Sequence, residues 1–209
     1  ALQFLPTNPP YASFGKAVYS ANSFYTTDDG LLRSLAFLTH ATSPIDLYGA
    51  MVLKASFNNG VFNWTGDSII PPARYNNSGD YVILYEPLMA WNEAGTIGYL
   101  AFPGSRYGTT GSNIGIQPIV YRTINSGSSW QLMPTMDFDS PDAMPIRNRL
   151  QKVDGSGTQV IPNMANQEGW DVIVDKNGKL HIACVLYGAA TNMVDSVYYP
   201  RNNGTEGYN

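Results

Sequence analysis

Six side chains in the predicted loops have the chemistry needed to bind an anionic ligand or a sugar. Guanidinium groups bind carboxylates through paired, charge-assisted hydrogen bonds, and aromatic rings stack against sugar faces. A carboxyl group among them could act as an acid or a base. These candidates are Arg106, Tyr107, Arg147, Arg149, Glu168 and Trp170, with His40 as a further exposed polar residue. For Tyr107, which lies in a glycine-rich loop, a role in anchoring that loop is the more ordinary interpretation.

Two short acidic motifs could suggest a metal site, but each has a simpler interpretation. Asp175-Lys-Asn-Gly178 lacks the later acidic ligands of a calcium loop and is typical of a hairpin turn. The carboxylates of Asp137, Asp139 and Asp142 could bind a cation, although they are more simply read as part of a solvated loop. The two histidines lack metal-ligand spacing. The sequence therefore predicts no metal ion and no cofactor.

A repeated pattern of strand, polar turn and strand indicates the elements that carry these loops. Three such hairpins are closed by Gly30, Gly95 and Gly178. Counted from these glycines, the second strands carry small residues at one shared position, namely Ala36, Ala101 and Cys184. We therefore expect Cys184 to fill a small core position. Because both faces of the second strands are apolar, each sheet should have a neighbour on both sides, as repeated units do.

A second marker follows each hairpin in the same order. Its best copy is Thr123-x-Asn125-x-Gly127-x-x-Trp130. Asn and Gly adopt positive φ at little cost and the Asn side chain can bond nearby amides, so a tight turn is expected. Trp130 should then fill an apolar gap between sheets. The other copies are degenerate and consist of Ser56, Asn58 and Gly60 with Trp64, and of Asn202 and Gly204.

This second marker resembles the Asp-box, or BNR repeat, of sialidases and related β-propellers, with Asn in place of the usual Asp. The resemblance implies an all-β fold of four-stranded antiparallel blades. It also implies that the box residues are structural and lie on the face opposite the ligand-binding loops. For that reason the loop residues named first, and not the box residues, are the candidates for binding.

We predict a single β-propeller domain over residues 1–209, with about three blades at 16–70, 81–136 and 170–209. A long loop at 137–169 separates the last two blades, and a helical turn is expected within it, after Pro141. A β-sandwich is the alternative, since it also has short strands at regular spacing. Propellers typically have ~4–8 blades. We therefore expect a segment of a larger propeller, or a ring completed by a partner chain.

Composition excludes several classes of function. Only 13% of the 209 residues are charged, and the net charge of -4 provides no basic field for nucleic acid. No apolar run approaches the roughly 20 residues of a membrane span. A single cysteine excludes an internal disulfide.

The predicted function is a non-catalytic propeller segment of a secreted or surface protein, which binds a glycan or a protein or serves as a scaffold. An extracellular or cell-surface location is implied by the resemblance. The alternative is a sialidase-like glycoside hydrolase, which needs an acid, a Tyr nucleophile assisted by Glu, and an arginine cluster. The Arg-Ile-Pro signature of that family is absent, since Met144-Pro-Ile-Arg147 has these residue types in another order.

Overall fold

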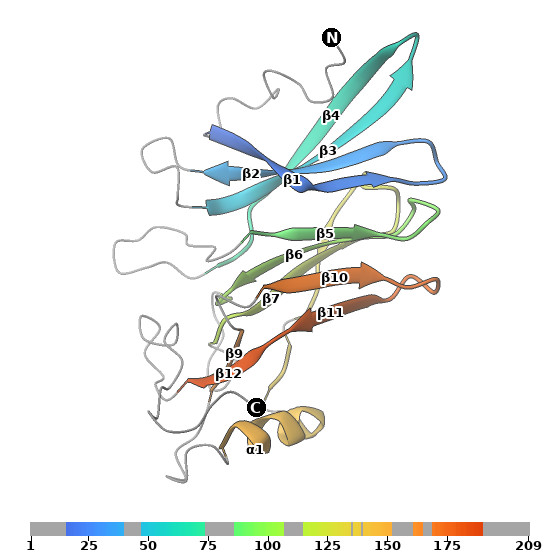
Figure 1. Cartoon of the computed structure of the whole chain (residues 1–209). Coiled ribbons are helices and arrows are strands. Elements are labelled where there is room, and N and C mark those ends of the chain that lie inside the picture. Colours follow the sequence, from blue (N-terminus) through green and yellow to red (C-terminus); the bar gives the residue numbers. More distant parts are fainter. Residues whose placement is uncertain are drawn as a thin grey trace.

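The computed structural model describes residues 16–39, 47–73, 86–106, 115–134, 136–138, 140–151, 161–164 and 169–189. In this part the chain is mostly β, and its antiparallel sheets are stacked one on another (Figure 1). The all-β prediction is therefore confirmed. Five of the residues singled out from the sequence, together with His40, lie outside the described residues: Tyr107, Asp139, Glu168, Asn202 and Gly204.

Two four-stranded antiparallel sheets form the first two layers of the stack. The first sheet has the order β1 (Lys16–Thr26), β2 (Leu32–Thr39), β3 (Leu47–Asn58) and β4 (Val61–Ile69). The second sheet has the order β5 (Leu88–Trp91), β6 (Gly98–Gly104), β7 (Gln117–Thr123) and β8 (Gln131–Leu132). The strands pair in chain order, so each sheet is a meander.

The third layer consists of two antiparallel strand pairs, β10 (Trp170–Val174) with β11 (Leu180–Cys184) and β9 (Ile161–Met164) with β12 (Leu186–Ala189). β10 pairs with β11 from Trp170–Cys184 to Val174–Leu180, and β9 pairs with β12 from Met164–Leu186 to Ile161–Ala189. We call β9 to β12 together the third ribbon. In β1 the register shifts between Tyr19 and Phe24.

The connection predicted as a long loop at 137–169 contains regular structure. The helical turn expected after Pro141 is present as a 3-10 helix, Pro141–Ala143, followed by α1 (Met144–Gln151). The helix α1 contacts β9 and β12. β9 itself also lies within the connection, where the sequence analysis expected no strand.

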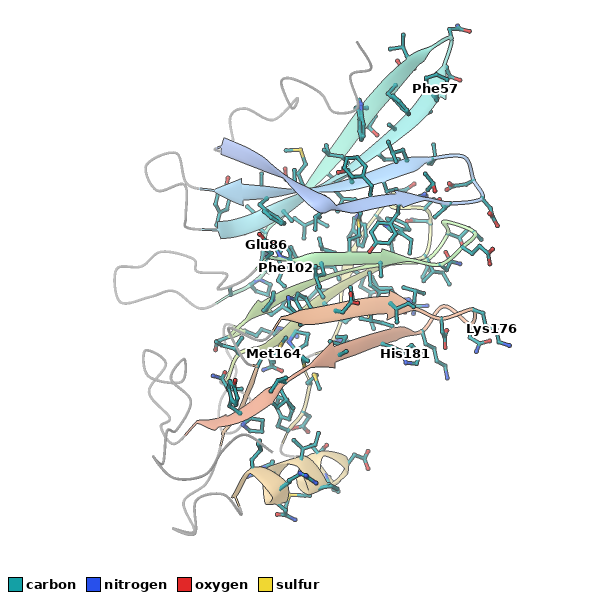
Figure 2. All side chains as sticks on the ribbon, viewed as in Figure 1. Phe57, Glu86, Phe102, Met164, Lys176 and His181 are labelled. Atoms are coloured by element: carbon teal, nitrogen blue, oxygen red, sulfur yellow. The ribbon has the colours of Figure 1, made fainter. Side chains whose placement is uncertain are left out.

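The second sheet is buried on both faces, as its apolar second strand predicted. All seven residues of β6 are buried. On one face Leu100 and Phe102 belong to the same apolar core as Leu35 and Phe37 of the first sheet. Phe102 is labelled in Figure 2. On the other face Ala101 and its neighbours pack against Val172 of the third ribbon and the side chains around it.

Counting from the hairpin glycines misaligns the second sheet by one residue. The first pair beside each turn is Thr26–Leu32, Trp91–Gly98 and Val174–Leu180. The second turn therefore holds one residue more, and a shift of one residue moves a side chain to the opposite face. Ala101 consequently corresponds to Leu35 and not to Ala36.

The expectation that Cys184 fills a core position is wrong, because its thiol is exposed. Its counterpart in the first sheet, Ala36, is fully buried within a four-stranded sheet. In the described part of the chain β11 pairs with β10 alone, whereas β2 has a strand on each side. Fewer neighbouring side chains are therefore available to cover Cys184 than to cover Ala36. Most of β11 is likewise exposed, which contradicts the prediction of two buried faces for the third repeat.

Candidate functional site

The strands of the stack run between two ends. At one end lie the hairpins that join β1 to β2, β5 to β6 and β10 to β11, together with the turn between β7 and β8; this is the right side of Figure 1. We call it the turn end. The opposite side, where β2 and β6 end, is the loop end. The resemblance places structural residues at the turn end and ligand-binding residues at the loop end.

The turn after β7 is held by its own side chains. The Thr123 hydroxyl donates to Asn125 Oδ1 over 2.9 Å and accepts the Gly127 N–H over 3.0 Å. Asn125 Oδ1 also accepts the Ser129 N–H over 3.0 Å, while its amide donates to the Ser129 hydroxyl. A carboxylate at position 125 could not make this last donation. The Asn that replaces the usual Asp is therefore used as a donor as well as an acceptor.

Positive φ falls on different residues from those expected. In the turn after β7, the left-handed residues are Ser126 and Gly127, and Asn125 contributes through its side chain instead. The turn after β3 likewise uses Asn59 and Gly60, which is the two-residue pattern of a tight hairpin. The expectation that Asn125 itself adopts positive φ is wrong.

Bonds between adjacent sheets join the hairpins of the turn end. The Asp28 N–H donates to the Glu93 carbonyl across the first two sheets, over 2.9 Å. Lys54 of β3 donates across the same two sheets to the Ser126 carbonyl over 3.4 Å. Within the second sheet, the Ser126 N–H donates to the Thr96 carbonyl. The turns are thereby tied into one continuous framework.

A further kind of inter-sheet bond occurs at both interfaces between the layers. Arg33 Nη2 of the first sheet donates to the Gly95 carbonyl of the second sheet over 2.9 Å. Tyr99 of the second sheet donates to the Gly178 carbonyl of the third ribbon, also over 2.9 Å. Arg33 and Tyr99 hold the same place in their strands, one residue after the first pair beside the turn. The stacking therefore follows one rule, in which a side chain bonds to the hairpin glycine of the next sheet.

Arg33 is the most unusual side chain of this framework, because it is charged and fully buried. Its guanidinium forms an ion pair with Asp29 at 2.5 Å and also donates to the Thr27 hydroxyl. It lies over the ring of Trp91, 4.2 Å from the centroid. A buried cation is tolerated when it is paired and hydrogen-bonded in this way. The site therefore joins two sheets.

The ion pair changes the acidity of Asp29. Burial acts to raise the pKa of this carboxyl, but hydrogen bonds from Arg33, Thr27 and the Leu31 N–H, with the Arg33 charge, lower the pKa to about 2. Sequence reasoning did not single out this pair. The signal was a lone arginine inside the apolar run Leu-Arg-Ser-Leu-Ala-Phe-Leu of β2.

We expect the Asp29 pair to lose its contribution to stability in acid. A carboxyl whose pKa is lower in the folded state stabilises that state above its unfolded pKa of roughly 3.9, and the contribution disappears as pH falls toward about 2. Urea unfolding of the wild type and of Asp29→Asn, measured from neutral pH to pH 2, checks this. The stability difference between them should shrink below about pH 4, and a difference that stays constant would contradict it.

At the loop end, Arg106 is half-buried and bonded to the backbone. It forms an isolated bridge with Ala73, and its guanidinium donates to the Met133 carbonyl over 3.1 Å. Nearby, the Tyr121 hydroxyl donates to the Ile70 carbonyl over 3.2 Å. Burial raises the pKa of Tyr121, and the Arg106 charge partly opposes this. Arg106 therefore links the connection after the first sheet to the segment after β8, and Tyr121 links β7 to the same connection.

The remaining candidates are not brought together with Arg106 in the described part of the chain. Arg147 and Arg149 lie on α1, against β9 and β12, and Arg149 is exposed. Trp170 opens β10 and packs, half-buried, against the core between the second sheet and the third ribbon. The structure thus places Arg147 and Arg149 together on α1, on a different element from Arg106, and gives Trp170 a packing role.

Three further findings bear on what the site can do. Among the described residues, no group of His, Cys, Asp and Glu side chains is arranged to hold a metal ion. Within the same part of the chain, no helix is long and apolar enough to cross a membrane. No known family model matches the sequence, and neither a curated protein nor a solved structure matches it.

Proposed function

We propose that the stacked sheets are blades of a β-propeller, and that the chain is a non-catalytic scaffold that presents its loop end to a glycan or protein ligand. The observation that carries this proposal is the bonded framework of the turn end. The turn end is tied together by repeated bonds between sheets, such as those of Arg33 and Tyr99. Loops positioned by such a rigid framework are where binding residues usually lie.

The arrangement of the apolar layers supports the propeller. The second sheet has a neighbour on each face, and the first strands are the ones in contact, since β5 contacts both β1 and β10. A radial array of meander sheets has this order of contacts. Under this proposal the ring is completed by further blades, from the same protein or from a partner. We also propose that the protein is secreted or lies at the cell surface.

The engagement of Arg106 favours a binding role over catalysis. In a sialidase-like site, arginines converge on the carboxylate of the substrate. Here the Arg106 guanidinium donates to the Met133 carbonyl, while Arg147 and Arg149 lie on a helix against the third ribbon. Arg106 and the two arginines of α1 therefore contact different parts of the fold.

A paired assay tests the proposal. We expect the protein to retain immobilised sialylated or neutral glycans, or a protein ligand from a defined panel, and to release no fluorophore from a fluorogenic sialoside. Arg106→Ala should at most weaken retention, with Arg149→Ala as the matched arginine control on α1. Sialoside hydrolysis by the wild type that disappears in Arg106→Ala would instead establish the hydrolase.

A further inference from the structure

The third ribbon also carries the repeated inter-sheet position, but among the described residues no further sheet covers it. Counted from the first pair beside each turn, the residue that corresponds to Arg33 and Tyr99 is His181. The side chains of Arg33 and Tyr99 are buried between sheets, whereas 60% of the His181 side chain is exposed. Its imidazole bonds to Asp175 over 3.2 Å, much as Arg33 pairs with Asp29. An imidazole N–H can donate to a carbonyl.

The face around His181 is open and combines the apolar residues Ile173 and Ala183 with the carboxylates of Asp171 and Asp175. Ile173 lies directly opposite His181 in the register, and it is 66% exposed. The corresponding residue of the second sheet, Ala90, is 2% exposed because the third ribbon covers it. We call the surface of Ile173, His181 and Ala183 the tail face. Figure 2 shows His181 at the lower, right-hand part of the stack.

The outer face of the first sheet has an exposed apolar residue where the other two layers have a buried one. Phe24 lies where the second sheet has Met89 and the third ribbon has Val172, both buried against a neighbouring sheet. Phe24 is instead 42% exposed and lines an apolar groove of about 740 Å³. Leu32 and Phe62 line the same groove. We call this surface the head face.

Gly30, the hairpin glycine beside the head face, is not closely contacted by another sheet, whereas Gly95 and Gly178 are. A Cβ added at Gly95 would lie 2.6 Å from Asp29 of the first sheet, and one at Gly178 would lie 2.6 Å from Ile97 of the second sheet. At Gly30 nothing lies within 4 Å of that point, and the residue lines the groove. The head face therefore offers a hairpin glycine with no sheet against it.

We propose that a second copy of this chain docks head to tail, with the tail face of one copy in the head groove of the other and His181 donating to the Gly30 carbonyl. The contact would repeat the two interfaces already present within the chain. One chain carries both the missing donor and the missing acceptor, which favours a second copy over another occupant. Because the two faces differ, the contact is heterologous and builds rings or open chains. The proposal rests on the stacking part of the proposed function.

Two charge substitutions and their mixture test the proposal by sedimentation velocity over a wide range of concentration. Wild type should associate as its concentration rises. Phe24→Asp blocks the head and Ile173→Asp blocks the tail, so each variant alone should lose association and sediment as a monomer. An equimolar mixture still has one intact head and one intact tail, and it should form a heterodimer that grows no further.

Matched controls separate docking from general effects of charge or folding. Ile124→Asp changes an isoleucine that is 68% exposed on the turn after β7, away from both faces, and it should associate like wild type. His181→Tyr should also associate, since Tyr99 occupies the equivalent position, whereas His181→Ala should weaken association. Far-UV circular dichroism and thermal melts establish that each variant is folded.

Three results would overturn the docking proposal. They are a wild type that stays monomeric at every concentration, a mixture of the two blocked variants that forms no heterodimer, and an Ile124→Asp variant that dissociates as readily as Ile173→Asp. A monomeric wild type that still retains ligand would remove the docking and leave the binding role in place. A wild type that associates but retains no ligand would remove the binding role and leave the docking in place.

Discussion

Replacing Trp91 with alanine is expected to lower the free energy of unfolding by roughly 3–5 kcal/mol, the usual range for a core tryptophan. Trp91 is 7% exposed and belongs to the core shared by the first and second sheets. Its ring meets the edge of Trp130 at a centroid distance of 5.6 Å and carries the Arg33 guanidinium on its face. The substitution removes the packing of two sheets and the surface on which a buried cation rests. Urea unfolding at one fixed protein concentration measures it.

The matched control is Trp130→Ala, which removes an equally large side chain. Trp130 is only partly buried against the same core, so we expect a loss of about 2 kcal/mol. A second control uses Gly98, because a Cβ there would lie 2.6 Å from the Trp91 ring. Gly98→Ala should therefore destabilise wild type and be nearly neutral in Trp91→Ala. A loss for Trp91→Ala no larger than that for Trp130→Ala would contradict this account.

Asp29→Ala is expected to cost roughly 3 kcal/mol, because it leaves the Arg33 charge buried without its partner. The Arg33 side chain is fully buried, while the Asp29 side chain is 23% exposed. We therefore place the cost at the lower end of the range for breaking a buried pair. The neighbouring residue provides a matched control. Asp28→Ala keeps the backbone bond to Glu93, and Asp28 is exposed, so its effect should stay within about 0.5 kcal/mol.

The companion variant Arg33→Met distinguishes a charge effect from a packing effect. It removes the buried cation but keeps an apolar stem beside Trp91, so it should cost less than Asp29→Ala. Once Arg33 is Met, adding Asp29→Ala should have little further effect, since these two residues act on one interaction. Additive losses in the double variant would show that the ion pair does not couple the two positions.

Local patterns in the sequence were sufficient for most of the strands and for the positions of their turns, but not for β9. Hairpin glycines, apolar strands and the Thr123–Asn125–Gly127 spacing all act over a few residues, and the predicted turn forms with bonds confined to Thr123–Ser129. Apolar residues on both faces of β6 correctly indicated a sheet with two neighbours. The helical turn after Pro141 was likewise a local property.

The faces and partners of these elements were decided only by tertiary structure. One additional residue in the turn before Gly98 reversed the faces of the second sheet relative to the count from the hairpin glycine, and no pattern of residue types records such a shift. The pairing of β9 with β12 joins segments across the connection, which local propensity does not determine. Arg33 looked like a misplaced charge until the fold brought Asp29, Trp91 and the Gly95 carbonyl around it. A residue chosen by its chemistry alone, such as Arg106, was a ligand candidate in the sequence and a backbone partner in the fold, because a guanidinium bonds whichever acceptor the packing supplies.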